Sequence, residues 1–197
     1  MSDLKNLLFE FEQTLKENNT ELLKMLQIGL TNDEISQLLF KIEGLSDEKL
    51  HVLYNWRNGI KYDSEWTVGE FYFFSLGVML SLEDVIQHIN YLQESINTGS
   101  KFLLPLFASG NGDYVLYQAD IKSKDFGCLF LHAPMLTLSE KPVSIYDSLE
   151  TLLKTVIECY KQGAYRIGDD GTLNVDYNIE QQVSRSINKN AEFWKPN

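Results

Sequence analysis

The segment FLLPLFASGNGDYVLYQ, residues 102–118, is the strongest structural signal in this chain of 197 residues. Two apolar runs, 102–107 and 114–118, flank a short stretch of Ser, Gly, Asn and Asp. An Asn-Gly pair between apolar runs is typical of a β-hairpin, because both residue types tolerate positive φ. Residues 126–132 and 136–143 are two further strand candidates. We therefore expect a β-hairpin here, with further strands after it.

Helical patterns lie on both sides of the predicted strands. Apolar residues recur at spacings of three and four, which predicts amphipathic helices. The predicted helical ranges are 3–17, a short turn through 22–29, 31–44, 46–59, 81–99, 147–162 and 178–189. Thr31 and Glu34 form a capping-box pattern, Ser46 is the expected cap of the next helix, and Asn58-Gly59 its expected end. The chain thus contains both helical and strand patterns, and its length predicts one domain, residues 1–197.

The charge is strongly acidic and unevenly distributed. The chain has 28 acidic and 17 basic residues, and residues 1–100 carry −9 of the net −11. Phosphate binding needs clustered Lys and Arg, so nucleic acid is a poor partner for this surface. A basic protein is a better electrostatic match, although ordinary solubility charge would give the same composition.

Targeting and membrane signals are absent from the sequence. No run approaches the roughly 20 apolar residues of a transmembrane helix, and the first residues lack the apolar core of a signal peptide. The two cysteines, Cys128 and Cys159, both lie in apolar stretches and are expected to be buried thiols. These features predict a cytoplasmic protein, with no membrane partner.

Motifs for catalysis, cofactors and metals are also absent. The sequence has no phosphate-binding glycine loop and no GxSxG elbow, and Asp169-Asp170-Gly171 lacks the upstream ligands of a calcium loop. The three histidines, at positions 51, 88 and 132, form no local metal-ligand pair and are expected to be structural. We therefore expect no enzyme activity, no cofactor and no metal; an unrecognised hydrolase is the disfavoured alternative.

The candidate recognition residues follow the Asn58-Gly59 pair. Tyr62, Asp63, Glu65 and Trp66 combine aromatic and acidic side chains in an expected loop, which is the composition of a protein-binding hot spot. The alternative is that Trp66 is a core residue and the acids only face water. A second acidic candidate surface is the first helix, with Glu10, Glu12 and Glu17.

A separate group of residues is expected to be structural rather than functional. It comprises the two predicted turns, with Asn58, Gly59, Gly110, Gly112 and Asp113. Glycine at positive φ and a hydrogen-bonding Asp side chain are what such turns need.

The order of several short motifs resembles the SUKH superfamily, in its branch related to the fungal cell-wall-synthesis regulator. The motifs are LSDEKLHVLY at 45–54, Asn58-Gly59, SLED at 81–84, LPLFA at 104–108, GDY at 112–114 and SLETLL at 148–153. The resemblance covers residues 31–162, with residues 1–30 before it and a C-terminal extension, 163–197. The chain departs from the family pattern at Ser46, where proline is usual, and at Asn111, where glycine is usual.

The resemblance implies an α+β fold with a central, mainly antiparallel sheet and helices packed around it. It also implies a protein without a catalytic site. Bacterial members are mostly immunity proteins that bind and neutralise a cognate toxin, often a nuclease, whereas the fungal members are regulatory scaffolds. A basic toxin domain is therefore the expected partner, and a scaffold with a non-toxin partner is the alternative; the oligomeric state is left open.

Overall fold

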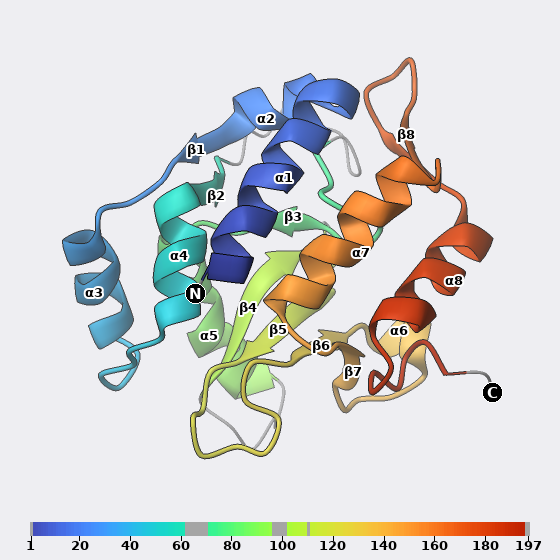
Figure 1. Ribbon diagram of the computed structural model, residues 1–197. Coiled ribbons are helices and arrows are strands. Elements are labelled where there is room, and N and C mark those ends of the chain that lie inside the picture. Colours follow the sequence, from blue (N-terminus) through green and yellow to red (C-terminus); the bar gives the residue numbers. More distant parts are fainter. Residues whose placement is uncertain (1, 62–70, 96–101, 110, 196–197) are drawn as a thin grey trace.

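The computed structural model describes residues 2–61, 71–95, 102–109 and 111–195 (Figure 1). The helices are α1 (Ser2–Asn18), α2 (Thr20–Met25), α3 (Asn32–Phe40), α4 (Glu48–Trp56), α5 (Leu82–Ser95), α6 (Pro134–Thr137), α7 (Leu149–Lys161) and α8 (Tyr177–Ile187). The strands are β1 (Leu26–Ile28), β2 (Arg57–Ile60), β3 (Val78–Met79), β4 (Leu103–Ala108), β5 (Tyr114–Gln118), β6 (Leu129–His132), β7 (Val143–Tyr146), β8 (Tyr165–Ile167) and β9 (Leu173–Val175). This is the α+β fold expected from the sequence.

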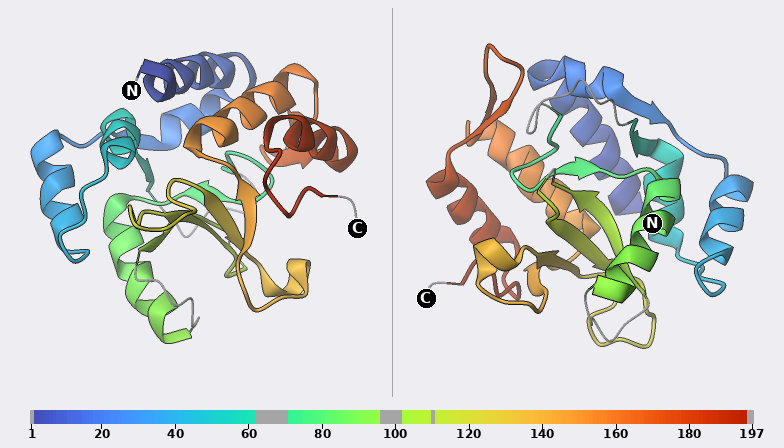
Figure 2. Two further views of the ribbon diagram at one scale, coloured as in Figure 1. Left: turned by 60° about the horizontal axis from the view of Figure 1, so that its bottom comes forward. Right: turned by 180° about the vertical axis from the view of Figure 1, so that it is seen from behind.

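The centre of the molecule is a five-stranded antiparallel sheet in the order β3-β4-β5-β6-β7. Helices α1 and α7 lie side by side over one face, and α5 packs against β4 on the other (Figures 1 and 2). Along β5, Val115 and Tyr117 belong to the main core while Tyr114 and Leu116 belong to a smaller cluster with α5. Successive strand side chains point to opposite faces, so a strand buried on both sides reads as one continuous apolar run.

The C-terminal extension covers the outer edge of the sheet. The backbone N–H of Phe193 donates to the Ser144 carbonyl at 3.0 Å, and Trp194 Nε1 donates to the Ile145 carbonyl at 2.7 Å. These bonds satisfy backbone groups that an uncovered edge strand would expose. The Glu180 carboxyl on α8, 2% exposed, accepts hydrogen bonds from the Tyr165 and Ser75 hydroxyls, both at 2.5 Å. The extension is thus tied to the sheet and to the segment before β3.

Burial sets the protonation preference of Glu180. Removal from water raises the pKa of its carboxyl, and the hydrogen bonds from Ser75 and Tyr165 only partly offset this effect.

Several predicted elements are confirmed. Helices form over the first amphipathic segment, after the Thr31–Glu34 capping box and over the last two predicted ranges. The capping box has both of its bonds: Glu34 N–H donates to Thr31 Oγ1 at 3.3 Å, and Thr31 N–H donates to Glu34 Oε2 at 2.8 Å. The hairpin predicted around residues 109–112 joins β4 to β5.

Other predictions about elements are wrong. Helix α4 ends at Trp56 rather than at Asn58-Gly59, because residues 57–60 pair as β2 with β1. Its cap is Asp47 rather than Ser46; the Asp47 carboxylate accepts the Lys49 and Leu50 N–H groups at 2.8 and 3.1 Å. The strand predicted at 136–143 is instead α6 followed by β7. Of the two cysteines, Cys159 is buried but Cys128 is only partly so.

None of the helices in the described ranges is both long enough and apolar enough to cross a lipid bilayer.

Candidate partner-binding surface

A groove of about 790 Å³ lies between α1 and α4, with the first residue of α3 among those that line it. Its apolar lining includes Phe9, which is 67% exposed, beside the partly buried Val52 and Trp56. Its polar lining includes Lys5 and Glu48. An exposed aromatic ring beside a partly buried apolar surface offers the kind of contact area that dominates affinity in protein interfaces.

Within this groove, the Glu12 carboxylate is hydrogen-bonded to Trp56. Glu12 Oε2 accepts hydrogen bonds from Trp56 Nε1 at 3.1 Å and from Arg57 Nη2 at 3.2 Å, and Glu12 Oε1 lies 3.1 Å from Lys16 Nζ. Burial raises the pKa of Glu12, but the bonds from Lys16 and Trp56 and the Arg57 charge outweigh burial and hold that pKa below its ordinary value. The ionised Glu12 carboxylate therefore links α1 to Trp56 and Arg57 on one side of the groove.

Beside the groove, residues 31–48 form an acidic edge. Its exposed charged residues are four carboxylates and one lysine, namely Asp33, Glu34, Glu43, Glu48 and Lys41. The remaining carboxylate, Asp47, is buried and accepts a hydrogen bond from Tyr117 at 3.0 Å. The exposed aromatic Phe40, 75% accessible, ends α3 within this edge. The acidic edge and the groove share Glu48, so they form one continuous surface.

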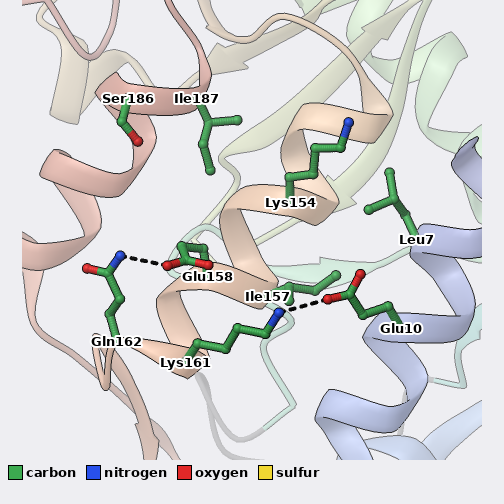
Figure 3. Close-up of a pocket in the computed structure, with 9 residues that line it drawn as sticks. All are labelled: Leu7, Glu10, Lys154, Ile157, Glu158, Lys161, Gln162, Ser186 and Ile187. Atoms are coloured by element: carbon green, nitrogen blue, oxygen red, sulfur yellow. Dashed lines mark hydrogen bonds and ion pairs between the residues drawn. The ribbon is translucent and has the colours of Figure 1, made fainter.

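The first-helix alternative, Glu10, Glu12 and Glu17, is divided by the packing of α1 on α7 and α4. A shallow pocket of about 360 Å³ between α1, α7 and α8 contains the Lys161 Nζ–Glu10 Oε1 ion pair at 2.8 Å (Figure 3). Glu12 is engaged as described above, while Glu17 is exposed. Two of the three carboxylates, those of Glu10 and Glu12, thus already form ion pairs within the chain.

The predicted recognition loop falls outside the described part of the chain. Tyr62, Asp63, Glu65 and Trp66 all lie outside the described residues, which stop at Lys61 and resume at Phe71. Their role stays a prediction.

The Asn58-Gly59 pair lies deep in the fold. Asn58 is 6% exposed; its Oδ1 accepts the Leu82 N–H at 2.9 Å and its Nδ2 donates to Glu83 at 3.0 Å. Gly59 has φ +68°, and a Cβ there would lie 2.4 Å from the backbone of Leu80 and Ser81. This pair therefore positions the start of α5 and does not face a partner.

The turn between β4 and β5 is held by Ser109 and Asp113. Ser109 N–H donates to the Asp113 carbonyl at 2.9 Å, and Ser109 Oγ donates to the Asp113 carboxylate at 3.3 Å. Gly112 has φ +86° with open space around its Cα, and Gly110 lies outside the described residues. These contacts are those of a turn.

The histidines occupy three different settings. His51 lines the groove, and His88 Nδ1 lies 3.0 Å from the Tyr114 hydroxyl. His132 is 7% exposed, and burial lowers the pKa of its ring, which disfavours a charge there. Within the described residues no three His, Cys, Asp or Glu side chains are grouped as a metal site would require.

Sequence reasoning missed the groove, although one signal was present. Phe9 falls outside the buried stripe of α1, which is made by Leu4, Leu8, Phe11 and Leu15. An aromatic residue on the polar side of an amphipathic helix is unusual and could have marked the surface. Its neighbours Val52 and Trp56 are more than 40 positions away and could not be paired with it from the pattern.

A comparison with models of protein families gives no match, and neither does a comparison with curated protein sequences. The surface described above and the resemblance of the sequence motifs are therefore the two indications of function.

Proposed function

We propose that this chain is a cytoplasmic, non-enzymatic immunity protein of the SUKH type that binds a basic toxin domain, with a nuclease as the first candidate, and neutralises it by contact. The observation that carries the proposal is the groove between α1 and α4, where exposed Phe9 adjoins the acidic edge. An apolar anchor next to an exposed edge with four carboxylates and one lysine suits a partner with apolar side chains among Lys and Arg.

Electrostatics supports a basic partner over an acidic or neutral one. The whole chain carries −11, and the acidic edge concentrates four exposed carboxylates against one lysine. A nuclease active site is itself positively charged toward nucleic acid, because phosphate binding requires Lys and Arg. Opposite potentials speed the encounter of two proteins and disfavour wrong partners.

The test uses the C-terminal domain of a toxin encoded beside this gene, in a catalytically inactive form. We expect a stable complex whose association rate falls as salt rises from about 0.05 to about 0.5 M, because the Debye length shortens severalfold over that range. Absence of any complex would overturn the immunity proposal and favour the scaffold alternative. A complex with a salt-independent association rate would overturn the role of the acidic edge.

The groove is tested with Phe9→Ser against a matched control, Tyr177→Ser, since the two aromatic rings are 67% and 70% exposed. Phe9→Ser should weaken the complex at least tenfold, about 1.4 kcal/mol, with an unchanged melting temperature. Tyr177→Ser should leave the affinity unchanged. Parental affinity of the Phe9 variant would exclude the groove as the interface.

The sequence-predicted loop is tested in the same assay. The double change Asp63→Ala with Glu65→Ala should also weaken binding at least tenfold if these acids form buried charge pairs. Parental affinity of this variant would leave the groove and the acidic edge as the interface without the loop.

A further inference from the structure

The connection between β6 and β7 carries the densest group of exposed apolar side chains in the described part of the chain. Met135 and Leu138 are each 91% exposed and Leu136 is 58% exposed. The other large exposed apolar residues there are spread over α1, β1, α3, α5, residues 121–126 and α8. Scattered apolar residues are normal on a surface, but a contiguous group indicates a contact site.

Hydrogen bonds and one left-handed residue restrain the backbone of this connection. Thr137 Oγ1 donates to the Ala133 carbonyl at 3.0 Å, and Ser139 Oγ donates to the Lys141 carbonyl at 3.1 Å. Leu138 has φ +52°, a left-handed conformation that a leucine rarely adopts. A backbone restrained in this way loses little entropy on binding, which suits this knob, residues 134–138, to recognition.

The charges next to this knob are self-complementary. Glu140 and Lys141 are both exposed, and neither side chain forms an ion pair within the described residues. A two-fold contact is reciprocal, so a contact that brings Glu140 of one copy to Lys141 of the other also brings Lys141 of the first copy to Glu140 of the second, and two ion pairs form.

We propose that α6 and Leu138 form a two-fold contact between two copies of this chain, with Met135, Leu136 and Leu138 at its centre and Glu140–Lys141 pairs at its rim. The net charge of −11 on each copy opposes association at long range. At about 0.15 M salt, charges further apart than about 8 Å are largely screened. The ion pairs at the contact therefore outweigh the long-range repulsion between the two copies.

A dimer formed in this way leaves the groove free. Helix α6 lies at one end of the molecule and α3, with the acidic edge, at the other (Figures 1 and 2). Each copy could therefore hold its own toxin domain, and the self-contact does not depend on the proposed function.

The test is sedimentation velocity on the full chain from about 1 to about 300 μM, a range that brackets the micromolar affinity of a small interface. We expect the mass to rise with concentration toward twice the 22.7 kDa of one chain. Leu138→Gly removes the apolar side chain while glycine accepts the left-handed backbone, so the fold should be retained and the dimer dissociation constant should rise at least tenfold. Ile121→Ser, at a residue 79% exposed elsewhere, is the control and should leave the dimer intact.

Charge exchange sharpens the test. Glu140→Lys and Lys141→Glu should each weaken the dimer, and the two changes together should restore it, since the exchanged pair is again self-complementary. A chain that stays monomeric at every concentration overturns the proposal, as does equal dissociation by Ile121→Ser. A monomeric chain whose Leu138→Gly variant loses affinity for the toxin domain would overturn the self-contact and assign the knob to that partner.

Discussion

Asn58-Gly59, in strand β2, and Gly112-Asp113, in the turn between β4 and β5, each place a glycine at positive φ beside a polar residue, yet the two sites differ in their surroundings. Asn58 is buried and holds the first turn of α5 through the Leu82 N–H, and the backbone of Leu80 and Ser81 leaves no room for a side chain on Gly59. Gly112, in contrast, has open space on the side where a Cβ would project.

The difference shows that the need for glycine at a site has a conformational part and a packing part. The conformational part is local: both glycines have left-handed backbones, which glycine adopts without strain. The packing part depends on what the rest of the chain places against the glycine. Substitutions at Gly59 and at Gly112 separate the two contributions.

The largest effect is expected from Gly59→Val. The left-handed backbone strains a β-branched residue, and its Cβ would meet the Leu80 carbon and Ser81 nitrogen at 2.4 Å. Strain of this kind costs about 1–3 kcal/mol, and the backbone overlap adds to it, so we expect a loss of more than about 3 kcal/mol in the free energy of unfolding. Urea unfolding measures it. A loss below about 1 kcal/mol would mean that the two segments can separate freely.

Asn58→Ala should have the next largest effect. It leaves the buried Leu82 N–H without an acceptor and removes the bond to Glu83. Loss of a helix cap and an unsatisfied buried donor together predict about 2 kcal/mol. Thr31→Ala, which removes the exposed cap of α3, is the matched control and should cost about 1 kcal/mol. Equal losses in the two variants would contradict the buried role of Asn58.

How far the sequence can predict such features is clear at α4. The periodic residues Leu50, Leu53 and Tyr54 are buried as a helical stripe predicts. Its ends were mispredicted because both depend on distant partners. The Asp47 carboxylate is engaged by Tyr117, 70 positions away, and the last turn is cut short by strand pairing with β1. Neither contact can be predicted from local helix propensity, because each joins segments that are far apart in the sequence.

The same reasoning applies to the candidate surface. Acidity near residues 31–48 is visible in the sequence, because charged residues of an amphipathic helix face water. The groove is not visible, since it exists only where α1 packs near α4 and leaves Phe9 uncovered. Likewise, no sequence pattern predicted that the chain between β6 and β7 would fold as α6 with Leu138 in a left-handed conformation.

Gly112→Val isolates the conformational part of the comparison. Its φ of +86° strains valine as at Gly59, but nothing lies within 4 Å of the new Cβ. We therefore expect a loss of only about 1–2 kcal/mol in the free energy of unfolding, clearly less than for Gly59→Val in the same urea titration. If the two valine variants were equally unstable, strain alone would explain both positions and the packing argument would fail.

Asp113→Asn should have the smallest effect. The turn keeps the Ser109 N–H bond to the Asp113 carbonyl and the Asp113 N–H bond to Ser109 Oγ, since both use the backbone of residue 113. The side chain contributes only the 3.3 Å bond from Ser109 Oγ, and an Asn carbonyl oxygen can accept it instead. The free energy of unfolding should change by less than about 0.5 kcal/mol.

The Asp113 carboxylate is also expected to be dispensable for recognition. Loss of one charge outside the groove and the acidic edge should slow association with the toxin domain slightly and leave the affinity within about threefold of the parent. Ser109→Ala is the structural control: it removes the Oγ bonds to Asn111, to the Asp113 N–H and to the carboxylate, and should cost about 1 kcal/mol of stability. If Asp113→Asn abolished binding at an unchanged melting temperature, Asp113 would be a recognition residue and this turn, unlike Asn58-Gly59, would belong to the partner-binding surface.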